Sequence, residues 1–191
     1  MTAYWWLRHD WIKYKVPVEE GRVIIPQDYL IPGFVPDPRE LRYSYVKGRR
    51  DTRKIADFSG WDDGVFFVNE RAHAVFKPMF DRHGRSYPVD CSGRPHYLVW
   101  IDTLIDAFDD RRSTVDRHGF EADLKEDISR IRHVVLRPGF STDADIFRLD
   151  GSYAMWRNII VSDRFRELYE SHGFTGLLFK QTANPLTKRS T

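Results

Sequence analysis

Two stretches of the chain show the same order of a short apolar run, a polar capping residue and a helical apolar stripe. In the first, Val65–Val68 is apolar and rich in β-forming residues, and Asn69 follows as an N-cap residue. The apolar positions then recur at the three- and four-residue steps of one helical face, at Ala72, Val75, Phe76, Met79 and Phe80. We expect Pro78 to kink or shorten this helix and Gly84 to end it in a left-handed turn. A further strand, Ser86–Val89, should follow.

The same order returns near the C-terminus. Asn158–Val161 predicts a strand, Ser162 an N-cap, and the helical stripe consists of Phe165, Leu168 and Tyr169. His172-Gly173 should close this helix before an extended run over Leu177–Phe179. The four residues from Val68 to Arg71 match those from Val161 to Arg164 in type. Either two similar strand-helix-strand units or two independent uses of one capping chemistry explains the match.

The remaining patterns predict mostly strands and loops. Strands are expected at Tyr4–Leu7, Val23–Ile25, Tyr97–Ile105, His133–Leu136 and Ile146–Leu149, with an edge strand over Tyr43–Lys47. An amphipathic helix is expected over Glu121–Arg132 through Leu124, Ile128 and Ile131. The pattern favours an α+β fold with a mixed or antiparallel sheet and a few packed helices. We expect a strand- and loop-rich part over residues 1–60, an α+β domain over 61–181 packed with it, and a flexible tail over 182–191.

Composition narrows the classes of partner and compartment. The chain has 30 Lys and Arg against 28 Asp and Glu, a formal charge of +2, which does not favour nucleic acid as a partner. The single cysteine, Cys91, has no internal disulfide partner and fits a reducing compartment. We find no signal-peptide core and no apolar stretch of about 20 residues, so no membrane span is predicted. These features predict a cytoplasmic protein.

Catalytic patterns are scarce. The sequence contains no glycine-rich phosphate loop and no nucleophile-elbow serine, so we expect no enzyme and no cofactor. One alternative is a metal-dependent hydrolase or nuclease, because a series of carboxylates could supply oxygen ligands to magnesium: Asp102, Asp106, Asp109 and Asp110. A solvated face neutralised by Arg111 and Arg112 explains the same series.

A second alternative is a nucleic-acid-binding module. The run from Lys47 to Lys54 holds five basic residues and reads more simply as a solvated loop. As a binding module, it would combine cationic side chains with neighbouring aromatic ones: Arg49, Arg50, Arg53 and Lys54 with Tyr43 and Tyr45.

The aromatic N-terminus is a candidate surface for a protein partner. Alternation along a strand points Trp5 and Trp6 to opposite faces, so one of the two is expected to be exposed. An exposed Trp near Arg8 has the composition of a binding hot spot. The candidate partner-binding residues are Trp5, Trp6, Arg8, Trp11, Arg49, Arg50 and Trp61.

Several segments, in order, resemble a family of bacterial immunity proteins of polymorphic toxin systems, of the myxobacterial type. They are Phe67–Arg71, Tyr97–Val99 before the Asp106–Ser113 turn, Asp145–Leu149, and Ile160–Arg164 with Gly173–Phe179, all within residues 64–180. The resemblance implies a non-enzymatic protein that binds a toxin or secreted effector encoded nearby and blocks its active site or an essential surface. It leaves open the identity of the toxin and the oligomeric state.

Overall fold

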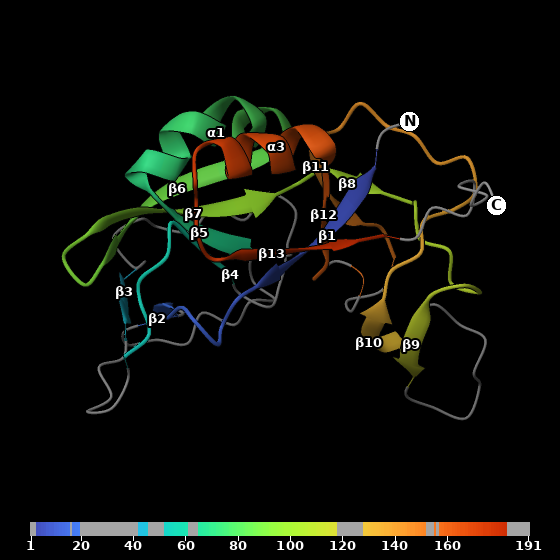
Figure 1. The fold of residues 1–191 in the computed structure, drawn as a ribbon, viewed down its shortest axis with the longest axis horizontal. Helices are drawn as coiled ribbons and strands as arrows, with labels where there is room; N and C mark the ends of the chain where they lie inside the picture. The colour runs from blue at the N-terminus through green and yellow to red at the C-terminus, as the bar shows by residue number, and fades with distance from the viewer. Residues whose placement is uncertain are drawn as a thin grey trace. The chain divides into compact units, whose positions relative to one another are not determined.

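The structure, a computed structural model, describes residues 3–15, 17–19, 42–45, 52–60, 65–117, 128–151, 155 and 157–182. Two compact units carry the two larger sheets seen among these residues (Figure 1). The five-stranded unit comprises Met1–Arg8, Ile101–Gly173 and Leu178–Thr191, and the six-stranded unit comprises His9–Trp100 and Phe174–Leu177. The expected α+β class is confirmed, while the division at residues 60 and 61 stays a prediction.

The six-stranded unit has the strand order β2-β3-β6-β7-β5-β4. Its elements are β2 (Pro17–Glu19), β3 (Arg42–Tyr45), β4 (Phe58–Gly60), β5 (Val65–Asn69), α1 (Glu70–His83), β6 (Gly84–Cys91) and β7 (Pro95–Ile101). Strand β5 is apolar from Val65 to Val68 because both of its faces are covered there. Phe66 contacts the α1 residue Phe80 on one side, and Phe67 packs against Tyr43 on the other. Figure 1 shows α1 lying over β5, β6 and β7.

The predicted start of α1 is confirmed, and the backbone conformation at its end differs from the prediction. Asn69 has an extended backbone, and its side-chain oxygen accepts a hydrogen bond from the Ala72 N–H. Pro78 does not shorten the helix, which continues to His83. Gly84 ends the helix as predicted, but its φ of −175° is extended rather than left-handed.

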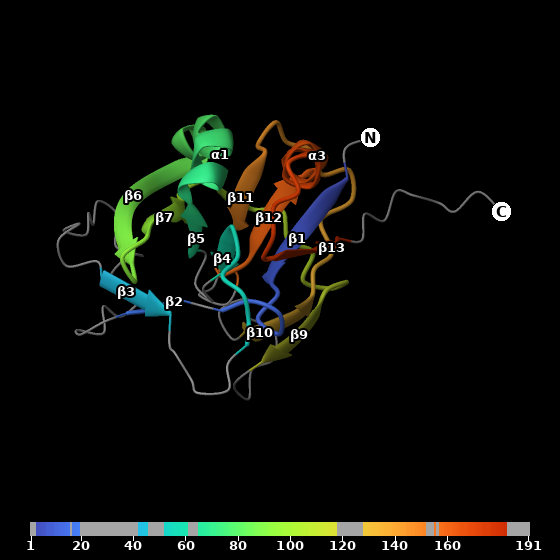
Figure 2. The ribbon, with the colours of Figure 1, turned by 60° about the vertical axis from the view of Figure 1, so that its left-hand side comes forward.

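The five-stranded unit has the strand order β13-β1-β12-β11-β8. Its elements are β1 (Tyr4–His9), β8 (Leu104–Ile105), β11 (Ile146–Leu149), β12 (Ile159–Ser162), α3 (Asp163–Ser171) and β13 (Leu177–Gln181), with a separate pair formed by β9 (Thr114–Arg117) and β10 (Ile128–His133). Helix α3 lies beside β1 and β12 (Figure 2). Tyr169 of α3 packs edge-on against Phe179 of β13 at 5.0 Å between ring centroids.

The two units repeat one local arrangement. In each, a hairpin leads into a helix with a polar N-cap, and the strand after the helix lies two places away from the strand before it. The strand between them is β7 in one unit and β1 in the other. The N-caps Asn69 and Ser162 have nearly the same backbone angles, with φ of −73° and −77°. The similarity of the two strand-helix-strand units is therefore structural and extends beyond the four matching residues.

Some sequence expectations were wrong. The helix expected over Glu121–Arg132 is a strand in its described part, because β10 begins at Ile128. A register shift between Ile128 and Arg130 places Ile128 and Ile131, three residues apart, in the same core, which imitates helical spacing. Strand β3 is not at the edge, since β2 and β6 flank it. The strand expected over Tyr97–Ile105 is divided into β7 and β8, and Val23–Ile25 lies outside the described residues.

Candidate functional site

A tight turn after β1 presents two apolar side chains to solvent. Trp11 is 63% exposed and Ile12 is 71% exposed, the highest values among the large hydrophobic residues that the structure describes. The turn is fixed by Asp10, whose carbonyl accepts hydrogen bonds from the N–H groups of Lys13 and Tyr14 at 3.2 and 3.0 Å. The sequence prediction included Trp11 and missed Ile12, although an apolar pair inside a polar stretch is itself a signal of exposure or contact.

Cationic side chains surround this turn. Lys13 is exposed and makes an ion pair with the buried Asp10 at 3.5 Å. Arg53 is exposed and donates from Nη1 to the Trp11 carbonyl at 3.1 Å. Lys54 is also exposed, and its backbone bonds to that of Lys13 and Lys15. We call these five residues, Trp11, Ile12, Lys13, Arg53 and Lys54, the Trp11 surface.

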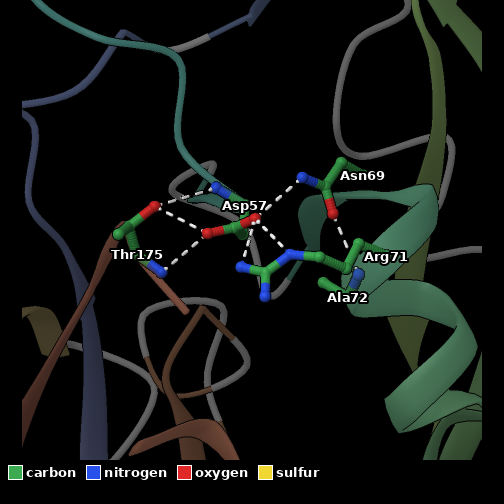
Figure 3. Close-up of polar contacts among 5 residues, drawn as sticks. All are labelled: Asp57, Asn69, Arg71, Ala72 and Thr175. Carbon is green, nitrogen blue, oxygen red and sulfur yellow. Dashed lines mark hydrogen bonds and ion pairs between the residues drawn. The ribbon is translucent and has the colours of Figure 1, made fainter. Parts of the chain in front are cut away.

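Asp57 joins three separate parts of the six-stranded unit (Figure 3). Its carboxylate accepts hydrogen bonds from Asn69 Nδ2 at 2.9 Å, from Arg71 Nη2 at 2.9 Å, and from both N and Oγ1 of Thr175 at 3.0 and 2.8 Å. Burial alone would raise the pKa of Asp57. The hydrogen bonds and the charge of Arg71 outweigh burial and hold this pKa below its usual value.

The Asp57 contacts continue to the Trp11 surface. Thr175 is followed by Gly176, whose carbonyl accepts the N–H of Asp10 at 2.9 Å. Gly176 has a φ of +108°, and a Cβ there would lie 1.8 Å from the carbonyl oxygen of Phe58. Only glycine fits this close approach. Asp57 therefore positions the segment that anchors Asp10 and, through it, the exposed turn.

The five-stranded unit contains a matching aspartate. Asp145 precedes β11 as Asp57 precedes β4, and it accepts hydrogen bonds from Ser162 Oγ at 3.0 Å and Arg164 Nη1 at 3.2 Å. In both units the N-cap N–H also donates to the carbonyl of this aspartate at 3.0 Å. Each arginine stands two residues after its N-cap, so the matching sequence segments predicted above share one bonding pattern.

The other candidate surface residues near the N-terminus, Trp5, Trp6 and Arg8, lie outside the Trp11 surface. Trp6 is 2% exposed, with the guanidinium of Arg8 4.9 Å from its ring centroid. Trp5 is half-buried, and its ring nitrogen donates to Asp163 at 2.7 Å. The expectation that one of the two is exposed is wrong, because a core covers one face of β1 and α3 the other. Arg8 is exposed, and the remaining candidates Arg49, Arg50 and Trp61 lie outside the described residues.

The aspartate series does not form a metal site. Asp106 pairs with Arg137, Asp109 with Arg112 and Asp110 with Arg117. Asp102 directly follows β7. Within the described part of the chain, no three His, Cys, Asp or Glu side chains are grouped so that they could hold a metal ion. Three of the four carboxylates pair with separate arginines, and Arg112 is one of the two arginines expected to neutralise the series. Asp109 and Asp110 are partly buried rather than fully solvated.

The aromatic half of the nucleic-acid alternative is buried. Tyr43 and Tyr45 are core residues of the six-stranded unit, and the Tyr45 hydroxyl lies 3.1 Å from Nε2 of the buried His96. Neither ring is available to stack on a base. Arg53 and Lys54 are exposed.

The comparisons with known proteins agree with the resemblance. The model of the immunity protein family (Imm11) matches residues 8–184. No curated protein matches the chain. No helix in the described ranges is long and apolar enough to cross a membrane. The family match covers most of the chain, including both units, and the chain therefore belongs to the immunity protein family Imm11.

Proposed function

We propose that the protein is an immunity protein that binds a cognate toxin or secreted effector in the cytoplasm and neutralises it by occlusion, without catalysis. The observation that carries this proposal is the family match over residues 8–184. The exposed Trp11 surface supports it, because Trp and Arg, the types of Trp11 and Arg53, are enriched at the centres of protein interfaces.

The two rival functions receive less support. A metal-dependent hydrolase would need the carboxylates of Asp102, Asp106, Asp109 and Asp110 to converge, and three of them pair with different arginines. A nucleic-acid-binding module would need accessible aromatic rings beside the basic segment, and Tyr43 and Tyr45 are buried. Neither of these side-chain arrangements occurs among the described residues.

The direct test uses the reading frame adjacent to the gene. The product of that frame is expressed in a susceptible bacterium with and without this protein, and growth is measured. We expect growth arrest without the protein and recovery with it, and a complex of fixed stoichiometry in size-exclusion chromatography with light scattering. A toxic neighbour that this protein neither binds nor neutralises would refute the proposal.

A further inference from the structure

The Trp11 surface combines the most exposed apolar side chains in the described part of the chain with a fixed backbone. Trp11 and Ile12 are adjacent, and the other exposed large hydrophobic residues in the described ranges, Leu104 and Leu178, are less exposed. A tryptophan held in water gains much apolar burial when it enters a pocket. Truncation of such a residue at an interface centre commonly has a large effect on affinity.

The turn requires little ordering before it binds. The Asp10 carboxylate accepts the Lys13 N–H at 3.3 Å, in addition to the two bonds to its carbonyl. The Trp11 carbonyl is held by Arg53, and the backbone of Lys15 and Lys54 forms a further bond at 2.9 Å. A surface fixed in its bound conformation loses less entropy on association, which favours tight binding.

The charge around the turn selects the kind of partner. Lys13, Arg53 and Lys54 are exposed cations. The nearby carboxylate of Asp10 is only 9% exposed and already pairs with Lys13. A partner with acidic side chains around an apolar pocket would complement these three exposed cations.

We propose that the Trp11 surface is the toxin-binding surface, and that it docks Trp11 and Ile12 into an apolar pocket with an acidic rim on the cognate toxin. This inference rests on the proposed function. Asp57 acts as a positioning residue, because its bonds to Thr175 hold the segment whose Gly176 carbonyl binds Asp10.

The test measures binding of the purified product of the adjacent reading frame by surface plasmon resonance. Trp11→Ala should raise Kd by about 30-fold or more and Ile12→Ala by about 10-fold, as expected for residues at an interface centre. The double charge reversal Arg53→Glu with Lys54→Glu should slow association and weaken its dependence on salt. Leu178→Ala and Lys180→Glu, exposed positions on β13, are matched controls and should change Kd less than twofold.

The outcomes separate this inference from the proposed function. Wild-type binding that Trp11→Ala and Ile12→Ala change by less than threefold overturns the inference and leaves the immunity function intact. Absence of wild-type binding to a toxic neighbour overturns both. Retention of a single-stranded oligonucleotide that Trp11→Ala abolishes would assign the surface to nucleic acid and overturn the toxin assignment. Unchanged urea midpoints for the variants show that the fold is retained.

Discussion

Replacement of Asp57 by alanine should destabilise the six-stranded unit by about 3 kcal/mol. The side chain is 13% exposed and accepts hydrogen bonds from Asn69, Arg71 and Thr175. A hydrogen bond to a charged group contributes about 1.5–3 kcal/mol, and a buried donor left without an acceptor costs about 1–3 kcal/mol. Most of the lost free energy of unfolding comes from the two Thr175 donors, which are left without an acceptor. The Arg71 side chain contributes less, because it is 54% exposed and water can solvate it.

Urea denaturation of the wild type, Asp57→Ala, Thr175→Val and the double variant measures this directly. Thr175→Val removes the hydroxyl that donates to Asp57 and keeps the backbone N–H, so it should cost about 1 kcal/mol. The double variant should be more stable than the sum of the single losses predicts, by about 1 kcal/mol of coupling, because the two side chains are in direct contact. Arg71→Ala should cost less than Asp57→Ala.

Two results would refute the reasoning. If Asp57→Ala changes the free energy of unfolding by less than about 0.5 kcal/mol, the carboxylate is not a structural acceptor. If Arg71→Ala costs as much as Asp57→Ala, the ion pair rather than the Thr175 contact dominates. If the Trp11 surface binds a toxin as proposed, Asp57→Ala should also raise the Kd through the displaced turn. A less stable variant with unchanged Kd would show that Asp57 does not position the surface.

Three further predictions concern single positions. Gly176→Ala should cost at least about 3 kcal/mol in urea denaturation, because its Cβ would overlap the Phe58 carbonyl, and a loss below about 1 kcal/mol would contradict the close approach. Asn69→Ala and Ser162→Ala should each lower the free energy of unfolding by about 1 kcal/mol. A loss from Asn69→Gly as large as that from Asn69→Ala would count against capping by the side chain. Burial lowers the pKa of His96 below its ordinary 6.5, so the unfolded chain takes up the proton first and stability should fall as pH drops below 6.5. Urea titrations of His96→Gln should show a shallower fall, and an unchanged slope would exclude His96 as its source.

The sequence predicted the elements whose signals are local. The caps Asn69 and Ser162 stand between an apolar run and a helical stripe, so their role follows from neighbours within a few positions. The helix expected through Ile128 failed for an equally local reason, because a bulge in β10 produces the spacing of a helix. The spacing of apolar residues alone does not distinguish a helix from a bulged strand.

The contacts that build the candidate surface are distant in sequence. Asp57 and Thr175 are 118 positions apart, and no spacing rule joins them. The sequence identified Trp11 as a candidate binding residue from its residue type. Its exposure depends on how Asp10 and Gly176 fix the turn. Trp6 is also a tryptophan of the N-terminal segment and is buried, because it packs into the core on one face of β1. The sequence pattern did not reveal which elements cover each face of a strand, and that cover decides whether a side chain lies in the core or at the surface.

The place of β1 between β12 and β13 affects how the chain folds during synthesis. Trp5 bonds to Asp163, 158 positions later, so β1 leaves the ribosome long before either neighbouring strand exists. At about 5–20 residues per second, that interval is on the order of ten seconds. During it, Trp5 and Trp6 lack the cover they have in the finished sheet. Completion of the five-stranded sheet is therefore a late event, and Trp5 and Trp6 stay uncovered until it occurs.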